Sequence, residues 1–103
     1  MYPLTVNTLV RLTNSISTTP EIPCNKTGAI RLHFPVGYVS TSIEIWDKTP
    51  DGNYSNTGLT ITVPDVSTTR GSVRVDLKSF PASSLKLVTN QNDSTKDVGV
   101  VGK

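Results

Sequence analysis

The chain has 103 residues, of which 35% are hydrophobic and 17% are charged, and its formal net charge is +2. This length favours a single domain that buries roughly 65% of its unfolded surface around one core. The lysines and arginines are scattered singly along the chain, so the composition argues against a basic patch for nucleic acid or for an anionic membrane.

The cysteine content and the hydropathy pattern exclude two further classes of protein. Cys24 is the single cysteine, so the fold is expected to stand without an intrachain disulfide. No stretch reaches the about 18 consecutive apolar residues of a membrane helix, and the first residues lack the basic and apolar regions of a signal peptide. We therefore expect a soluble protein that is made in the cytosol.

Alternation of apolar and polar residues predicts strands along most of the chain, beginning at residues 4–12 (LTVNTLVRL). Leu9 is out of phase there, which indicates a bulge or a side chain turned to the other face. Residues 13–28 follow as a polar connector with two prolines and too little periodicity for a helix, although Ile16 and Ile22 are suited to pin it to a sheet.

Six further strands are expected in chain order, at residues 29–34, 41–46, 59–63, 72–77, 84–89 and 97–102. Ser and Thr make up 26 of the 103 residues, which suits strands whose outer faces carry hydroxyls. The pattern predicts an all-β fold, a single-domain antiparallel β-sandwich or small barrel of about six to eight short strands. The domain would span residues 1–103, with residues 1–28 as an irregular N-terminal arm and connector.

The residue types that catalysis and metal binding need are scarce. His33 is the only histidine and is expected on the polar face of its strand, and no Ser lies in a G-x-S-x-G context. One His and one Cys do not supply the usual ligands of zinc, and residues 47–55 lack the spacing of an EF-hand loop. We expect no enzyme activity and no cofactor, and the sequence leaves open only a hard-cation site assembled from separate loops.

The polar stretch DKTPDGNYSNTG, residues 47–58, separates two expected strands and contains a Pro-Asp-Gly turn signal. It predicts a long hairpin loop. Trp46 and Tyr54 flank this loop, and exposed aromatic residues of these types serve as anchors in protein interfaces and in sugar sites. A carbohydrate site would use these two rings for stacking and Asp51, Asn53 and Asn56 for hydrogen bonds; alternatively, Trp46 covers a sheet edge or a gap in the core.

Residues 28–58 and 71–103 carry a Pro-Gly turn before a strand, an Asp-Gly loop with aromatic neighbours, and a V-x-V and L-K-L pair of strands. In these features the chain resembles small all-β virion proteins of tailed bacteriophages. The positions that carry the likeness are Pro35, Gly37, Ile43, Ile45, Asp51, Gly52, Tyr54, Val73, Val75, Leu85, Lys86, Leu87 and Gln91.

The resemblance implies a capsid decoration or cementing protein, or a small tail or head-fibre component, located in the virion after synthesis in the bacterial host cytoplasm. Its partners would be major capsid or tail subunits and further copies of itself, with a surface glycan as the alternative and with no nucleic acid or membrane. The residues expected to contact a partner lie in the N-terminal segment, the connector and the hairpin loop: Tyr2, Leu4, Val6, Arg11, Ile22, Trp46, Asp51, Asn53 and Tyr54.

Overall fold

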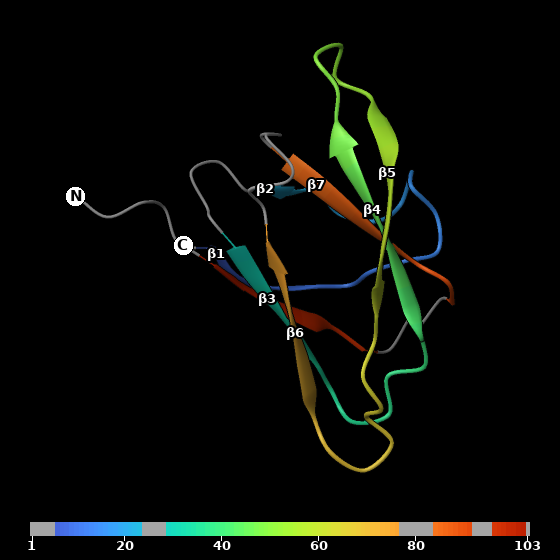
Figure 1. Ribbon diagram of the computed structural model, residues 1–103, viewed down its shortest axis with the longest axis vertical. Helices are drawn as coiled ribbons and strands as arrows, with labels where there is room; N and C mark the ends of the chain where they lie inside the picture. Colours follow the sequence, from blue (N-terminus) through green and yellow to red (C-terminus); the bar gives the residue numbers. More distant parts are fainter. Residues whose placement is uncertain (1–5, 24–28, 77–83, 92–95, 103) are drawn as a thin grey trace, which may run out of the picture.

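The computed structural model describes residues 6–23, 29–76, 84–91 and 96–102, and within these ranges it contains eight strands and no helix. Four strands form sheet A in the order β1-β8-β3-β6, and four form sheet B in the order β2-β7-β4-β5 (Figure 1). Every pairing is antiparallel. The strands are β1 (Val6–Val10), β2 (Ile22–Pro23), β3 (Ala29–Phe34), β4 (Ser42–Lys48), β5 (Tyr54–Thr62), β6 (Gly71–Asp76), β7 (Ser84–Thr89) and β8 (Val98–Gly102).

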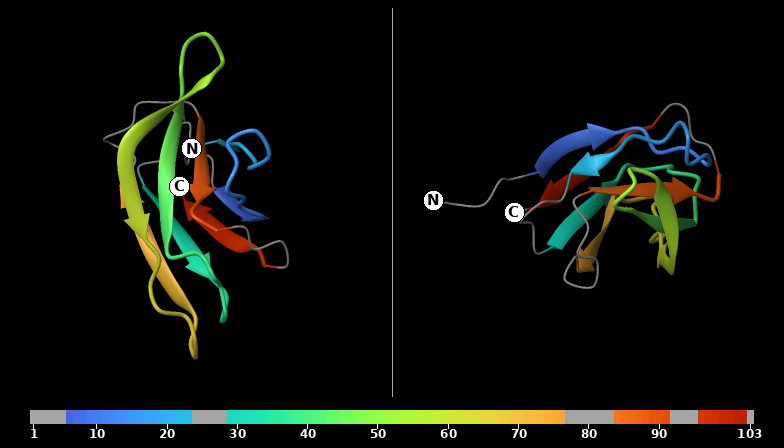
Figure 2. Two further views of the ribbon diagram at one scale, coloured as in Figure 1. Left: turned by 90° about the vertical axis from the view of Figure 1, so that its right-hand side faces the viewer. Right: turned by 90° about the horizontal axis from the view of Figure 1, so that it is seen from above.

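Figure 2 shows the two sheets lying one over the other, which confirms the expected all-β fold as a β-sandwich. The core forms where alternating residues of both sheets point inward. In β3, Ile30, Leu32 and Phe34 are buried while Arg31 and His33 are exposed. The facing residues of sheet B are equally buried. These are Ile43, Ile45, Leu85 and Leu87. Full burial of a side chain of this kind stabilises the fold by about 1.5–3 kcal/mol.

A bulge in β5 changes one expectation. Glu44 pairs with Thr60 and Trp46 pairs with Asn56, so the segment around Gly58 holds two more residues than the strand opposite. Gly58 has a φ of +81°, and the side chain of Leu59 is 50% exposed. Strict alternation with the buried Ile61 and Val63 would turn Leu59 toward the core, but the bulge turns that side chain outward.

The N-terminal segment contributes one strand to each sheet, as the strand expected at 4–12 and the pinning role expected of Ile22 indicated. Within its described residues 6–23 lie β1, which pairs with β8, and β2, which pairs with β7. Leu12 and Ile22 are fully buried in the core. Residues 6–23 are therefore part of the sandwich, because their apolar side chains complete the interior between the two sheets.

The connector between β1 and β2 runs along β7. Thr89 donates its backbone N–H to the carbonyl of Thr13 at 3.0 Å, and the buried hydroxyl of Thr19 donates to the carbonyl of Leu87 at 3.0 Å. Lys86 adds a hydrogen bond from Nζ to the carbonyl of Ile16 at 3.0 Å. The first two contacts satisfy backbone groups of β7, and the third satisfies a carbonyl of the connector.

Candidate functional site

The hairpin loop between β4 and β5 is held by its own polar groups. Thr49 donates its N–H to the carbonyl of Asn53 at 2.7 Å, and Gly52, with a φ of +90°, donates to the carbonyl of Thr49 at 3.0 Å. One carboxylate oxygen of Asp51 accepts from the Thr49 hydroxyl and from the Asn53 N–H. The bond from Thr49, followed by that from Asn53, holds the pKa of Asp51 below its ordinary value. Asp51 and Asn53 therefore build the turn.

Trp46 and Tyr54 lie on one face of the hairpin, the outer face of sheet B. Trp46 pairs with Asn56 and Lys48 with Tyr54, so the two aromatic residues are diagonal neighbours. The Tyr54 hydroxyl donates to Glu21 Oε1, which also accepts from Lys48 Nζ at 3.0 Å. Both bonds keep the pKa of Glu21 below its ordinary value of 4.5, with the bond from Tyr54 as the larger cause.

The groups considered for sugar binding are mostly engaged within the protein. The ammonium of Lys86 lies 5.0 Å from the centroid of the Tyr54 ring, and Trp46 donates from Nε1 to Glu44 at 3.3 Å. The side-chain oxygen of Asn56 accepts the N–H of Gly58 at 2.9 Å, within the bulge. The outer face of sheet B is thus a network of internal contacts, and Glu21 and Lys86 are members of it that sequence reasoning missed.

The outer face of sheet A has a different character. Strand register places Leu9, Gly99, His33 and Ser72 in one row across the sheet, and Val101, Arg31 and Arg74 in the next row. The side chains of Leu9 and Val101 are 70% and 40% exposed. We call the surface formed by these two rows the A face.

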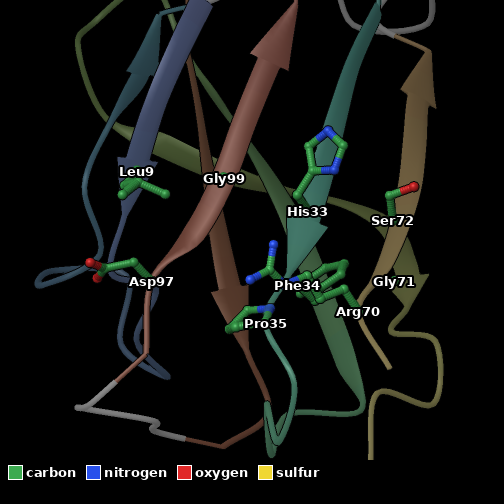
Figure 3. A pocket seen from close by; sticks show the side chains of 9 residues that line it. All are labelled: Leu9, His33, Phe34, Pro35, Arg70, Gly71, Ser72, Asp97 and Gly99. Carbon is green, nitrogen blue, oxygen red and sulfur yellow. The ribbon is translucent and has the colours of Figure 1, made fainter. Parts of the chain in front are cut away.

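An open hollow of about 550 Å³ lies on the A face over Gly99. Gly99 forms part of its floor, where an added Cβ would lie 3.4 Å from His33 Cβ and 3.8 Å from Leu9 Cδ2. Figure 3 shows Leu9 and His33 on the two sides of Gly99, and Asp97 and Arg70 are among the other residues that line the hollow. An open hollow of this volume has room for more than one side chain of a partner.

Arginines outnumber acidic residues on and around the A face. Arg31 and Arg74 are directly opposite each other on β3 and β6, where like charges repel. Arg31 donates from Nη1 to the Ser72 hydroxyl at 3.1 Å, and His33 makes no hydrogen bond to Ser72 or Asp97 in the described chain. The charged residues are Arg11, Arg31, Arg70 and Arg74 against Asp76 and Asp97. Such a face is complementary to an acidic partner.

The structure places the predicted N-terminal and connector contacts as follows. Tyr2 and Leu4 lie outside the described residues, as does the side chain of Val6, the first residue of β1. Arg11 is exposed and forms an ion pair with Asp97 at 2.8 Å. Ile22 is completely buried, so its prediction as a partner contact is corrected: its side chain belongs to the core and has no surface to offer.

The A face itself was not predicted as a unit. The sequence marks only Leu9, through its phase, and it assigns Arg31 and His33 to an outer face. What brings these residues beside Gly99, Val101 and Arg74 is the order β1-β8-β3-β6, which joins the two ends of the chain in one sheet. Strand order is set by long-range packing, so no local signal reveals this surface.

Metal-ligand groups and membrane-spanning helices are both absent from the described residues. These residues include no group of three or more His, Cys, Asp or Glu side chains that could hold a metal ion. The described part of the chain also has no helix of the length and apolarity that crossing a membrane requires. No family model, curated protein or solved structure matches the chain.

Proposed function

We propose that this chain is a non-enzymatic structural protein of a tailed-phage virion, which binds neighbouring capsid or tail subunits through the A face. The observation that carries the proposal is the combination on that face of exposed Leu9 and Val101, a hollow at Gly99, and two opposed arginines. The buried centre of a protein interface is more apolar than the rest of the surface, and arginine is enriched in interfaces.

The chemistry of the A face also suggests what the partner presents. The repulsion between Arg31 and Arg74 is relieved when carboxylates of a partner lie between them. Apolar side chains of the same partner would enter the hollow over Gly99 and contact Leu9. An acidic segment with an apolar anchor on a virion subunit fits both requirements. The virion setting itself is supported by the resemblance of residues 28–58 and 71–103 to phage virion proteins.

Co-sedimentation of the purified protein with particles of the virus tests the proposal. The wild-type chain is expected to sediment with the particle, and Arg31→Gln with Arg74→Gln is expected to remain in solution, because both exposed charges are lost. The control is Thr60→Glu with Thr62→Glu on exposed positions of β5, which changes the net charge by the same amount and should leave sedimentation intact.

Two results would contradict the proposal. A wild-type chain that never sediments with the particle removes the virion role. A double Arg variant that sediments as well as the wild type moves the binding surface away from the A face.

Carbohydrate binding is the second candidate, favoured by the placement of Trp46 and Tyr54 on one face of sheet B. Trp46 is half-buried and offers a stacking surface, whereas Lys86 lies over the ring of Tyr54. A glycan array compares the wild type with Trp46→Ala: binding that is lost in the variant would favour this candidate. Absence of binding by the wild type would contradict this candidate.

A further inference from the structure

Each sheet has two edge strands within the described chain: β1 and β6 in sheet A, and β2 and β5 in sheet B. An edge strand presents unpaired backbone N–H and C=O groups, and soluble proteins protect such edges with charges, proline, bulges or very short strands. The four edges of this protein differ in how far they follow that rule.

Three of the four edges are protected. β6 carries the charges of Arg74 and Asp76. β5 is interrupted by the bulge at Gly58, which has a positive φ. β2 has two residues, and one of them is Pro23, which has no N–H to donate. Further strands are therefore discouraged at these three edges.

β1 has none of these protections. Its sequence VNTLV contains no charged residue, no proline and no glycine, and its register with β8 continues without a bulge over five residue pairs. Asn7, Thr8 and Leu9 are all exposed, so the middle of the strand is open on both faces. A regular, uncharged strand rich in β-branched residues is well suited to accept another strand.

We propose that β1 pairs antiparallel with β1 of a second copy of this chain, in a register centred on Thr8. This register places Thr8 opposite Thr8 and Asn7 opposite Leu9, and it makes the two Leu9 side chains diagonal neighbours on the outer face. Thr–Thr and Leu–Leu neighbours are favourable on adjacent strands, so the strand is complementary to itself. When the same strand of both copies pairs about a two-fold axis, the interface is used up and the dimer is closed.

The charges around β1 are compatible with this pairing. Arg11 follows the strand directly, and Asp97 of the same chain neutralises it at 2.8 Å. In the antiparallel register the two Arg11 residues lie at opposite ends of the interface. The joined sheet would end on both sides at β6, where Arg74 and Asp76 oppose further addition, so the assembly stops at two copies.

The β1–β1 pairing does not depend on the proposed virion role. A dimer would, however, bind a virion lattice more strongly than a monomer. A two-fold axis perpendicular to the joined sheet places both A faces on the same side. A dimer would then engage two neighbouring subunits of a lattice at once, and the second contact benefits from the high effective concentration that the first creates.

Solution mass by light scattering tests the inference on the full chain. The wild type is expected to show twice the 11.1 kDa of one chain. Thr8→Lys and Thr8→Glu are each expected to be folded monomers, because Thr8 is exposed and like charges would stand opposite each other in the dimer. A mixture of the two variants is expected to regain the dimer mass, since Lys then faces Glu.

The matched control is Thr60→Lys on β5, the edge of sheet B, which should keep the dimer mass. A wild type that is monomeric at all accessible concentrations overturns the inference. So does a dimer that survives in the Thr8 variants, or one that the mixture fails to restore, because the interface then lies elsewhere. These masses are measured without the virus particle, so they are independent of the co-sedimentation result.

Discussion

Gly58 illustrates how one residue shapes an edge strand. Its φ of +81° lies in the left-handed region, and a Cβ added there would meet no atom within 4 Å. Gly58→Ala is therefore expected to destabilise the fold by about 1–2 kcal/mol through backbone strain alone. Urea unfolding monitored by circular dichroism measures this cost.

Asparagine provides the matched control for Gly58. Asn tolerates the left-handed region better than Ala, so Gly58→Asn should retain more stability than Gly58→Ala although its side chain is larger. Equal losses in both variants would mean that crowding, and not backbone strain, makes glycine necessary at the bulge.

From the lowered pKa of Glu21 we expect the free energy of unfolding to depend on pH. The pKa of this carboxyl in the folded protein lies below the ordinary value of 4.5, mainly because Tyr54 donates a hydrogen bond to it. The stabilisation by Glu21 is thus fully present above pH 4.5 and is lost as the pH falls through the folded pKa. Tyr54→Phe should raise the pKa of Glu21, measured by NMR titration. It should also lower the free energy of unfolding more at neutral than at acidic pH.

The Glu21→Gln background separates this linkage from other effects of the Tyr54 hydroxyl. In that background the cost of Tyr54→Phe should no longer depend on pH, because the titrating carboxyl is gone. If the cost of Tyr54→Phe is the same at all pH values in the wild-type background as well, the Tyr54–Glu21 bond does not form in solution.

Thr19 attaches the connector between β1 and β2 to strand β7. Its side chain is 2% exposed and donates to the carbonyl of Leu87. Thr19→Val keeps the shape and removes the donor, which leaves a buried carbonyl without this partner, so we expect a loss on the order of 1–3 kcal/mol. Thr19→Ser keeps the donor and should lose much less. Chemical denaturation compares the two variants, and a tolerated Val would show that the connector is held by packing alone.

Strands with clean alternation were predictable, and those with an interruption were not. The expected bounds of β3 and β7, at 29–34 and 84–89, agree with the structure. In β3 buried and exposed residues alternate without a break, and in β7 all residues but one are buried. The expected 59–63 strand misses the first part of β5, since Asn56 to Gly58 form a bulge with no alternation. The two-residue β2 is too short to leave any periodic signal.

The candidate site was harder to predict than the fold for a related reason. Turn chemistry in residues 47–58 is local, so Asp51 and Gly52 were assignable to a hairpin from the sequence. The A face depends on β8 lying between β1 and β3, a pairing of the two ends of the chain. Likewise, the burial of Ile22 depends on β7, more than 60 residues further along. Contacts of such sequence separation have no local signature.

Almost every connection joins a strand of one sheet to a strand of the other sheet. In chain order the strands belong to sheets A, B, A, B, B, A, B and A, so six of the seven connections change sheet and the β4–β5 hairpin is the exception. Sheet B is not complete until β7 is in place, and sheet A is not complete until β8, the last strand, is in place. Because most pairings are distant in sequence, folding is expected on the millisecond to second scale that non-local β topologies show.

This interleaving predicts a single cooperative unfolding transition. Trp46, the only tryptophan, lies on sheet B, so its fluorescence reports on that sheet, while circular dichroism reports on both. The two signals should give the same midpoint in urea, since the sheets share one core. Leu32→Ala in sheet A should then lower the stability seen by Trp46 fluorescence by about 2–5 kcal/mol, as much as that seen by circular dichroism. A variant that shifts only the circular dichroism signal would show instead that sheet B unfolds as a unit of its own.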